Sequence, residues 1–202
     1  MIGIIDHGSG NLRSVYNAFR YLGEDVKICD TPEALRSVDK IVLPGVGSSK
    51  DALAGFSRKR LIEPLLNEIG GGKLFLGICL GLQLLFDRSA EGGGTDCFGL
   101  IKGSVNIFPG GPGLKVPQIG WNTVELSGDV CPLFKGVKDG SYFYFVHSFY
   151  CDSSEPEFTV GKTEYGVNYA SAVWKENIFA VQFHPERSQK NGLDVLRNFV
   201  EL

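Results

Sequence analysis

One cysteine of this chain lies in a context that suits covalent chemistry. Cys79 stands between Gly77 and Gly81, where an apolar strand-like run gives way to a helix-like one. Flanking glycines tolerate crowded or left-handed backbone and so permit a sharp turn, and the free amides of a helix N-terminus stabilise a thiolate. The pattern predicts a nucleophile elbow, although G-x-C-x-G alone is equally typical of a small buried cysteine between packing glycines.

A cysteine nucleophile needs a base, and the chain has three histidines, His7, His147 and His184. His184 ends an apolar strand and precedes Pro185, which biases its backbone toward the extended region. Residues two apart in extended chain point to the same side, so Glu186 is predicted to orient the His184 ring. The alternative is a solvated turn that does no chemistry.

Acyl transfer also needs two N–H donors for the developing oxyanion. The amide of Leu80, directly after the cysteine, is the first candidate. The second is the amide of Val46 in the segment 44–47, Pro-Gly-Val-Gly, which ends a strand that the expected topology places near Cys79. An ordinary strand-terminating turn is the alternative for that segment.

Strands and helices alternate through the first half of the chain, and the second half is richer in glycine, proline, β-branched and aromatic residues. Strands are expected at 2–6, 26–29, 40–43, 74–77, 105–108, 122–126, 142–146, 159–163, 172–174 and 179–182, and helices at 12–22, from 31, at 53–69, after 79 and at 193–199. This order predicts an α/β fold: a doubly wound, mostly parallel sheet flanked by helices, with additional antiparallel strands in the second half.

Composition sets the broad class. The 202 residues are 43% hydrophobic and 21% charged, with a net charge of −3 and scattered lysines and arginines. We expect a single domain over 1–202 that binds neither nucleic acid nor membrane. The five irregularly spaced cysteines, without a C-x-x-C pair, favour free thiols in a reducing cytoplasm, and neither a metal nor a cofactor is expected.

The joint presence of these motifs resembles the class I glutamine amidotransferases, in which a Cys-His-Glu triad hydrolyses glutamine to glutamate and releases ammonia. Cys79, His184 and Glu186 match that triad. The segments 4–12, "IIDHGSGNL", and 117–122, "PQIGWN", are similar to the glutaminase subunit family of imidazole glycerol phosphate synthase. The resemblance covers essentially the whole chain and implies a class I glutamine amidotransferase-like fold.

The resemblance also implies a function. The chain would form a heterodimer with a (β/α)₈ cyclase and supply it with ammonia, from which the cyclase forms imidazole glycerol phosphate and aminoimidazole carboxamide ribonucleotide in histidine biosynthesis. Gly47, Gln83, Glu91 and Ser148 are similar to the residues of the family's glutamine pocket. For Gln83 and Glu91 the alternative is a surface polar residue.

Asn11 and Trp121 match positions at the family's cyclase interface; the alternatives are a helix cap for Asn11 and a core aromatic for Trp121. His147 lies in "YFVHS", which resembles a pocket-lining segment, but we favour a structural role for it. The sequence departs from the family's usual residues at three positions, His7, Phe149 and Arg187.

Two rival interpretations stay open. A free-standing γ-glutamyl cysteine hydrolase of the same fold would share the triad but gives no reason for the "GSGNL" and "PQIGWN" segments. A non-catalytic assembly subunit would keep the fold, with Cys79 of ordinary reactivity.

Overall fold

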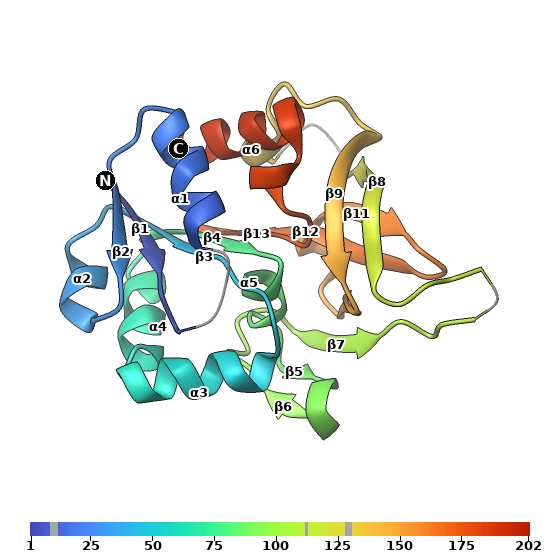
Figure 1. Cartoon of the computed structure of the whole chain (residues 1–202), viewed down its shortest axis with the longest axis horizontal. Helices are drawn as coiled ribbons and strands as arrows, with labels where there is room; N and C mark the ends of the chain where they lie inside the picture. The colour runs from blue at the N-terminus through green and yellow to red at the C-terminus, as the bar shows by residue number, and fades with distance from the viewer. Residues whose placement is uncertain (9–11, 112, 128–130) are drawn as a thin grey trace.

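The parallel core of the sheet is built from short apolar runs. The computed structural model describes residues 1–8, 12–111, 113–127 and 131–202. Its parallel strands are β1 (Ile2–Ile5), β2 (Val26–Cys29), β3 (Lys40–Leu43), β4 (Leu74–Ile78) and β13 (Ile178–Val181), in the order β2-β1-β3-β4-β13 (Figure 1). The last strand of the chain therefore lies beside β4, which brings the segment after β13 next to Cys79.

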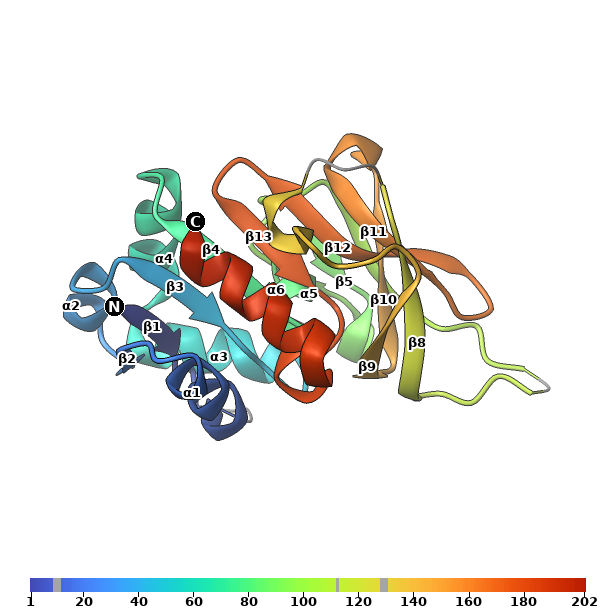
Figure 2. The ribbon, with the colours of Figure 1, turned by 90° about the horizontal axis from the view of Figure 1, so that it is seen from above.

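Helices cover both faces of this sheet, as a doubly wound fold requires. The helices are α1 (Leu12–Tyr21) and α6 (Gln189–Glu201) on one face, and α2 (Pro32–Arg36), α3 (Ser49–Lys59) and α4 (Ile62–Gly70) on the other (Figures 1 and 2). Successive strand residues alternate between the two cores: Val42 packs in the cluster that holds Phe19 and Phe199, and Ile41 packs in the cluster that holds Phe56.

Antiparallel strands dominate the second half, as predicted. They are β7 (Gly103–Ile107), β8 (Gln118–Leu126), β9 (Ser141–His147), β10 (Phe149–Ser153), β11 (Thr159–Glu164) and β12 (Asn168–Lys175), with the short pair β5 (Arg88–Ser89) and β6 (Thr95–Asp96). β12 joins β13 antiparallel and continues the sheet to β10 and β7. β8 and β9 form a hairpin that reaches the sheet through β11.

The structure differs from the sequence prediction at several places. The helix expected over 53–69 is two helices, because Arg60 adopts a left-handed conformation (φ 54°) that ends α3. The helix after Cys79, α5 (Leu80–Gln83), has a single turn. Strand β10 was not predicted at all, and neither was the pair β5–β6.

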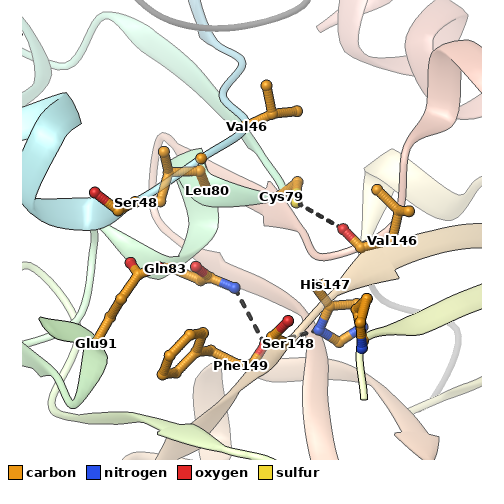
Figure 3. Close-up of a pocket in the computed structure, with 12 residues that line it drawn as sticks. Val46, Ser48, Cys79, Leu80, Gln83, Glu91, Val146, His147, Ser148 and Phe149 are labelled. Carbon is orange, nitrogen blue, oxygen red and sulfur yellow. Dashed lines mark hydrogen bonds between the residues drawn. The ribbon is translucent and has the colours of Figure 1, made fainter. Parts of the chain in front are cut away.

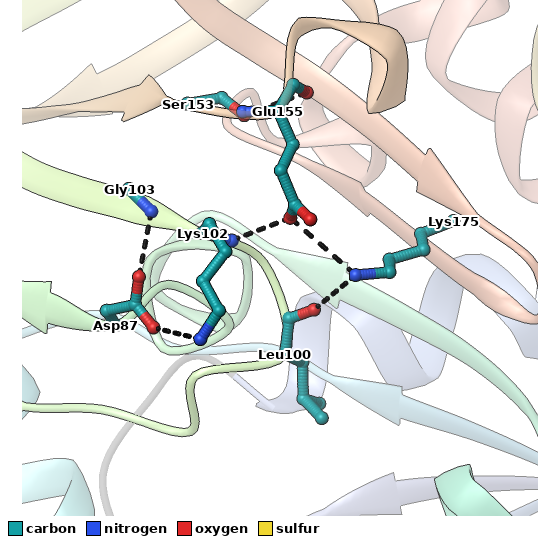
Figure 4. Close-up of polar contacts among 7 residues, drawn as sticks. All are labelled: Asp87, Leu100, Lys102, Gly103, Ser153, Glu155 and Lys175. Atoms are coloured by element: carbon teal, nitrogen blue, oxygen red, sulfur yellow. Dashed lines mark hydrogen bonds and ion pairs between the residues drawn. The ribbon is translucent and has the colours of Figure 1, made fainter.

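A polar network fastens the loop before β7 to β12 (Figure 4). The Asp87 carboxylate accepts the Gly103 N–H and pairs with Lys102 Nζ, both at 3.0 Å. The Glu155 carboxylate accepts the Lys102 N–H at 2.8 Å and lies 3.6 Å from Lys175 Nζ. These contacts tie the chain that follows the Cys79 region to the antiparallel strands.

Candidate active site

A pocket of about 440 Å³ opens at the carboxyl ends of the parallel strands, where ligands commonly bind in this fold class (Figure 3). It is lined by Val46, Gly47, Ser48, Cys79, Leu80, Gln83, Glu91, Pro117, Val146, His147, Ser148 and Phe149. The pocket thus brings together residues that the sequence nominated separately as nucleophile, oxyanion donors and glutamine-binding residues.

Cys79 sits on the predicted sharp turn between β4 and α5. Its backbone is strained, with φ 55° and ψ −103°, and its side chain is 5% exposed. The flanking glycines allow neighbouring backbone segments to approach closely, and neither glycine has a positive φ. A Cβ on Gly77 would lie 2.7 Å from the Gly81 carbonyl oxygen, and one on Gly81 would lie 2.0 Å from the Leu43 carbonyl oxygen. The turn therefore has an elbow's geometry, with the positive φ on the cysteine itself.

His184 and Glu186 lie together just beyond β13. His184 Nδ1 is 2.9 Å from a Glu186 carboxylate oxygen, and both side chains are buried. The predicted proximity is confirmed, and His184 itself is extended as predicted, with φ −98° and ψ 96°. The extended backbone expected to continue to Glu186 is wrong, because Pro185–Arg187 forms a 3₁₀ turn. The Ser188 hydroxyl donates to the His184 carbonyl at 2.7 Å and stabilises this turn.

The charge environment of His184 favours its protonated form. Burial by itself lowers the pKa of His184, but the attraction of Cys79 and the Glu186 carboxylate outweighs burial and raises this pKa to about 10. Within the described residues, Nε2 of His184 is buried without a hydrogen-bond partner. A solvated turn is incompatible with this burial, so that alternative is wrong.

The segment predicted to supply an oxyanion donor packs directly on the elbow. A Cβ on Gly45 would lie 2.9 Å from Leu80 Cβ. Gly47 has φ 95°, and the Val46 side chain is 37% exposed at the rim of the pocket. The roles of the Val46 and Leu80 amides as oxyanion donors stay predictions.

The predicted glutamine-binding residues all line the pocket. Gln83 is buried and donates from Nε2 to the Phe149 carbonyl at 3.1 Å, so it is not a surface residue. One Glu91 carboxylate oxygen accepts the Ser49 N–H at 2.6 Å, at the first turn of α3. Ser148 follows β9 directly and lines the same pocket. Their contact with substrate stays a prediction.

His147 makes contacts typical of a structural histidine. Its Nδ1 donates to the Phe149 carbonyl at 2.7 Å, and its Nε2 lies 3.3 Å from the Tyr169 hydroxyl. Burial lowers the pKa of His147 to about 4. These contacts support the structural role that we favoured from the sequence.

Of the two predicted interface residues, Asn11 lies outside the described residues. Trp121 is 46% exposed on β8 and makes an edge contact with Tyr144, their ring centroids 6.0 Å apart. The alternative of a core aromatic is therefore wrong for Trp121. His7, which departs from the family's usual residue, is buried and stacks on Phe56.

The sequence did not point to one residue beside Cys79. Gln182 is fully buried and donates from Nε2 to Cys79 Sγ at 3.5 Å. The available signal was a polar residue directly after the apolar run of β13. Over the described part of the chain, no cluster of three or more His, Cys, Asp or Glu side chains is arranged to hold a metal ion. Nor is any helix there long and apolar enough to cross a membrane.

Comparison with known proteins identifies the family. The family model described as glutamine amidotransferase class-I matches residues 3–202. The chain belongs to the class I glutamine amidotransferases. The family membership and fold class predicted from the sequence are thereby confirmed.

Individual members narrow the relationship. The chain is 50% identical over 202 residues to the imidazole glycerol phosphate synthase subunit HisH of Methanothermobacter thermautotrophicus, covering 100% of this chain and 98% of the relative. It is 47% identical to the HisH subunit of Methanocaldococcus jannaschii, with both chains covered completely. Among solved structures, PurLQS from Thermotoga maritima superposes with a TM-score of 0.78 at 21% identity, covering 99% of this chain and 97% of the other, which supports the amidotransferase fold.

Proposed function

We propose that this protein hydrolyses glutamine with a Cys79-His184-Glu186 triad and supplies the ammonia to a (β/α)₈ cyclase subunit in histidine biosynthesis. The observation that carries the proposal is the elbow at Cys79, set in a pocket beside a buried His184–Glu186 pair. The HisH names of its full-length relatives support the place of this activity in a synthase. Residues 1–202 act as a single amidotransferase domain in this proposal.

The reaction proceeds in two halves. Cys79 gives its thiol proton to His184, and its Sγ attacks the side-chain amide carbon of glutamine. The amides of Leu80 and Val46 stabilise the resulting oxyanion. The C–N bond then breaks as His184 gives its proton to the leaving nitrogen, which departs as ammonia and leaves a thioester. In the second half His184 takes a proton from water, the hydroxide attacks the thioester, and glutamate and the Cys79 sulfur are released. Glu186 holds the His184 ring in position throughout.

The pocket residues fit an amino-acid substrate. Gln83 and the start of β10 bound one side of the cavity, and the Glu91 carboxylate supplies negative charge for an α-ammonium group. Ser148 and Gly47 line the same cavity and complete the binding site in this proposal.

The test is to replace Cys79 by alanine in the complex with the cyclase. We expect loss of glutamine-dependent synthesis and retention of synthesis from added ammonia, because the cyclase does its own chemistry. Loss of both activities would contradict this division of labour. A second measurement distinguishes this proposal from the free-standing hydrolase. Glutamate release by the wild-type chain is measured alone and with the cyclase holding its nucleotide; a free-standing hydrolase is fully active without the partner.

A further inference from the structure

Gln182 is an uncharged polar side chain buried against the sulfur of Cys79. It follows β13 directly, is 0% exposed, and donates from Nε2 to Sγ at 3.5 Å. A buried amide destabilises a fold unless its groups are hydrogen-bonded, so a buried glutamine needs partners on both its ends. The partners of one end of the Gln182 amide therefore decide whether its oxygen or its NH₂ group faces the sulfur.

The orientation of the Gln182 amide is fixed by its neighbours. Gln182 Oε1 accepts from Gln83 Nε2 at 3.2 Å and from the Cys151 thiol at 3.8 Å. The Gln83 amide cannot be reversed, because its Nε2 also donates to the Phe149 carbonyl, which only accepts. Cys151 is fully buried, which raises the pKa of its thiol and keeps it a donor. With both donors on its oxygen, Gln182 must turn its NH₂ group toward Cys79.

The two contacts of the Cys79 sulfur respond oppositely to ionisation. The neutral thiol donates to the Val146 carbonyl at 3.9 Å and accepts from Gln182 at 3.5 Å. A thiolate has no proton for the carbonyl, so the first contact is lost. The second contact becomes a charge-assisted hydrogen bond, which is shorter and stronger than a neutral one.

We propose that Gln182 is a positioning residue of the glutaminase site, whose side-chain N–H holds the Cys79 sulfur in the elbow and stabilises it as a thiolate. The inference rests on the proposed function of Cys79 as nucleophile. Because Gln83 lines the substrate pocket and donates to Gln182, two side-chain hydrogen bonds connect the pocket wall to the nucleophile. Through these two hydrogen bonds, the position of the Gln83 side chain in the pocket wall fixes the position of the Cys79 sulfur.

The test is the pH profile of Cys79 alkylation by iodoacetamide in the full chain, with the labelled cysteine identified by mass spectrometry. The substitution is Gln182→Met, which keeps the length and removes the N–H donor. We expect the midpoint of the profile to move upward by about one pH unit, and kcat/KM for glutamine in the cyclase complex to fall about tenfold. The titratable groups near Cys79 are unchanged in this variant; they are His184, Cys151, Tyr169 and the pocket-lining His147 and Glu91.

The matched control is Gln118→Met. Gln118 is also a buried glutamine, and its Oε1 accepts from the Tyr169 hydroxyl at 3.0 Å, but no contact joins it to Cys79. It should keep the wild-type alkylation profile. An unchanged midpoint in folded Gln182→Met, or an equal shift in Gln118→Met, would overturn the inference. If Gln182→Met does not fold, Gln182→Leu removes the same donor and gives the same test.

Failure of the proposed function has a different signature. If wild-type Cys79 is alkylated no faster than the other cysteines, and Cys79→Ala still hydrolyses glutamine, then Cys79 is not the nucleophile. That result would not depend on Gln182. A wild-type protein with a reactive Cys79 and an unchanged Gln182→Met profile would reject the inference alone.

Discussion

Two buried histidines, less than forty residues apart in the chain, have opposite charge preferences. Burial disfavours the protonated ring in both. Around His184 the Cys79 sulfur and the Glu186 carboxylate reverse this effect and raise its pKa. His147 has a backbone carbonyl and a hydroxyl as hydrogen-bond partners and no carboxylate among the causes of its shift, so burial lowers its pKa to about 4. At neutral pH the His184 ring therefore holds a proton that it can transfer, and the His147 ring is neutral.

The first prediction concerns Glu186→Gln. Removing the carboxylate removes one of the causes that raise the pKa of His184, so this pKa should fall from about 10 toward the ordinary range. In the proposed mechanism His184 must be protonated to release ammonia, and it is protonated only below its pKa. The alkaline limb of kcat/KM for glutamine should therefore move to lower pH in the variant.

The control is Glu155→Gln, which removes a carboxylate of the distant Lys102–Lys175 network and should leave the alkaline limb in place. Identical limbs in wild type and Glu186→Gln would refute the assignment.

The second prediction concerns His147→Asn. The pKa of His147 is about 4 in the folded chain and 6.5 ordinarily. Between these values the unfolded chain binds a proton at His147 that the folded chain does not. The contribution of His147 to folding stability is therefore fully present above pH 6.5 and is lost as the pH falls toward 4. The loss from this residue is about 3 kcal/mol. The asparagine amide can still donate to the Phe149 carbonyl but does not titrate, so urea unfolding from pH 7 to 4 should show a shallower acid loss in the variant. An equally steep loss in both proteins would count against the burial of a neutral His147.

At the scale of elements, the elbow is held by contacts between β3, β4 and α5. The positive φ of Cys79 is a local strain of about 1–3 kcal/mol, which persists because its neighbours determine it. The register of β4 between β3 and β13 fixes where the turn begins, and the absence of a side chain at Gly81 lets α5 approach the Leu43 carbonyl. Cys79, the proposed nucleophile, is thus positioned by backbone packing.

The third prediction is that Gly81→Ala destabilises the fold and disables the site. Its Cβ would lie 2.0 Å from the Leu43 carbonyl oxygen, a backbone atom that cannot rotate away, so α5 or β3 must shift. We expect a loss of roughly 2 kcal/mol or more in urea unfolding, with loss of glutaminase activity. Gly70→Ala is the matched control, because a Cβ there meets no atom within 4 Å, and its stability should stay near that of wild type. Equal stability of the two variants would show that α5 can move away from the Leu43 carbonyl without loss of stability, and would contradict this prediction.

The sequence predicted the elements whose signals are local. The parallel strands are short apolar runs bounded by turns, and all five were found within about two residues of their ends. Strand β10, "FYCDS", was missed because it follows β9 after a single residue and mixes polar with aromatic side chains. The break between α3 and α4 was missed because an arginine, not a glycine, takes the left-handed conformation.

The triad candidates were predictable for a related reason. Cys79 and the His184–Glu186 pair each carry a recognisable local context, and the alternating pattern places their strands side by side. Gln182 was not predictable, since its importance depends on which atoms β10 and α5 bring against it. A polar residue at a strand end has many possible partners, and only the packed structure selects them.

At the scale of the whole molecule, the site lies next to an exposed apolar surface. Trp121, Ile119 and Tyr142 are 46%, 63% and 59% exposed on the β8–β9 hairpin. Ile119 is paired in register with Val146, which lines the pocket. A partner bound on this hairpin would therefore lie within one strand of the pocket, and ammonia released there would have a short path to it.

The last prediction follows from that placement. Trp121→Ala should weaken binding of the proposed (β/α)₈ cyclase partner about tenfold or more, because a half-exposed tryptophan supported by Tyr144 has the character of an interface hot spot. Stability should change little, since much of the ring is already in water. Tyr21→Ala is the control: Tyr21 is 77% exposed at the end of α1, away from the carboxyl edge of the sheet, and its loss should leave affinity unchanged. Isothermal titration calorimetry measures the affinity of both variants for the cyclase. Equal affinity of Trp121→Ala and wild type would move the docking surface off this hairpin and leave the pocket chemistry unaffected.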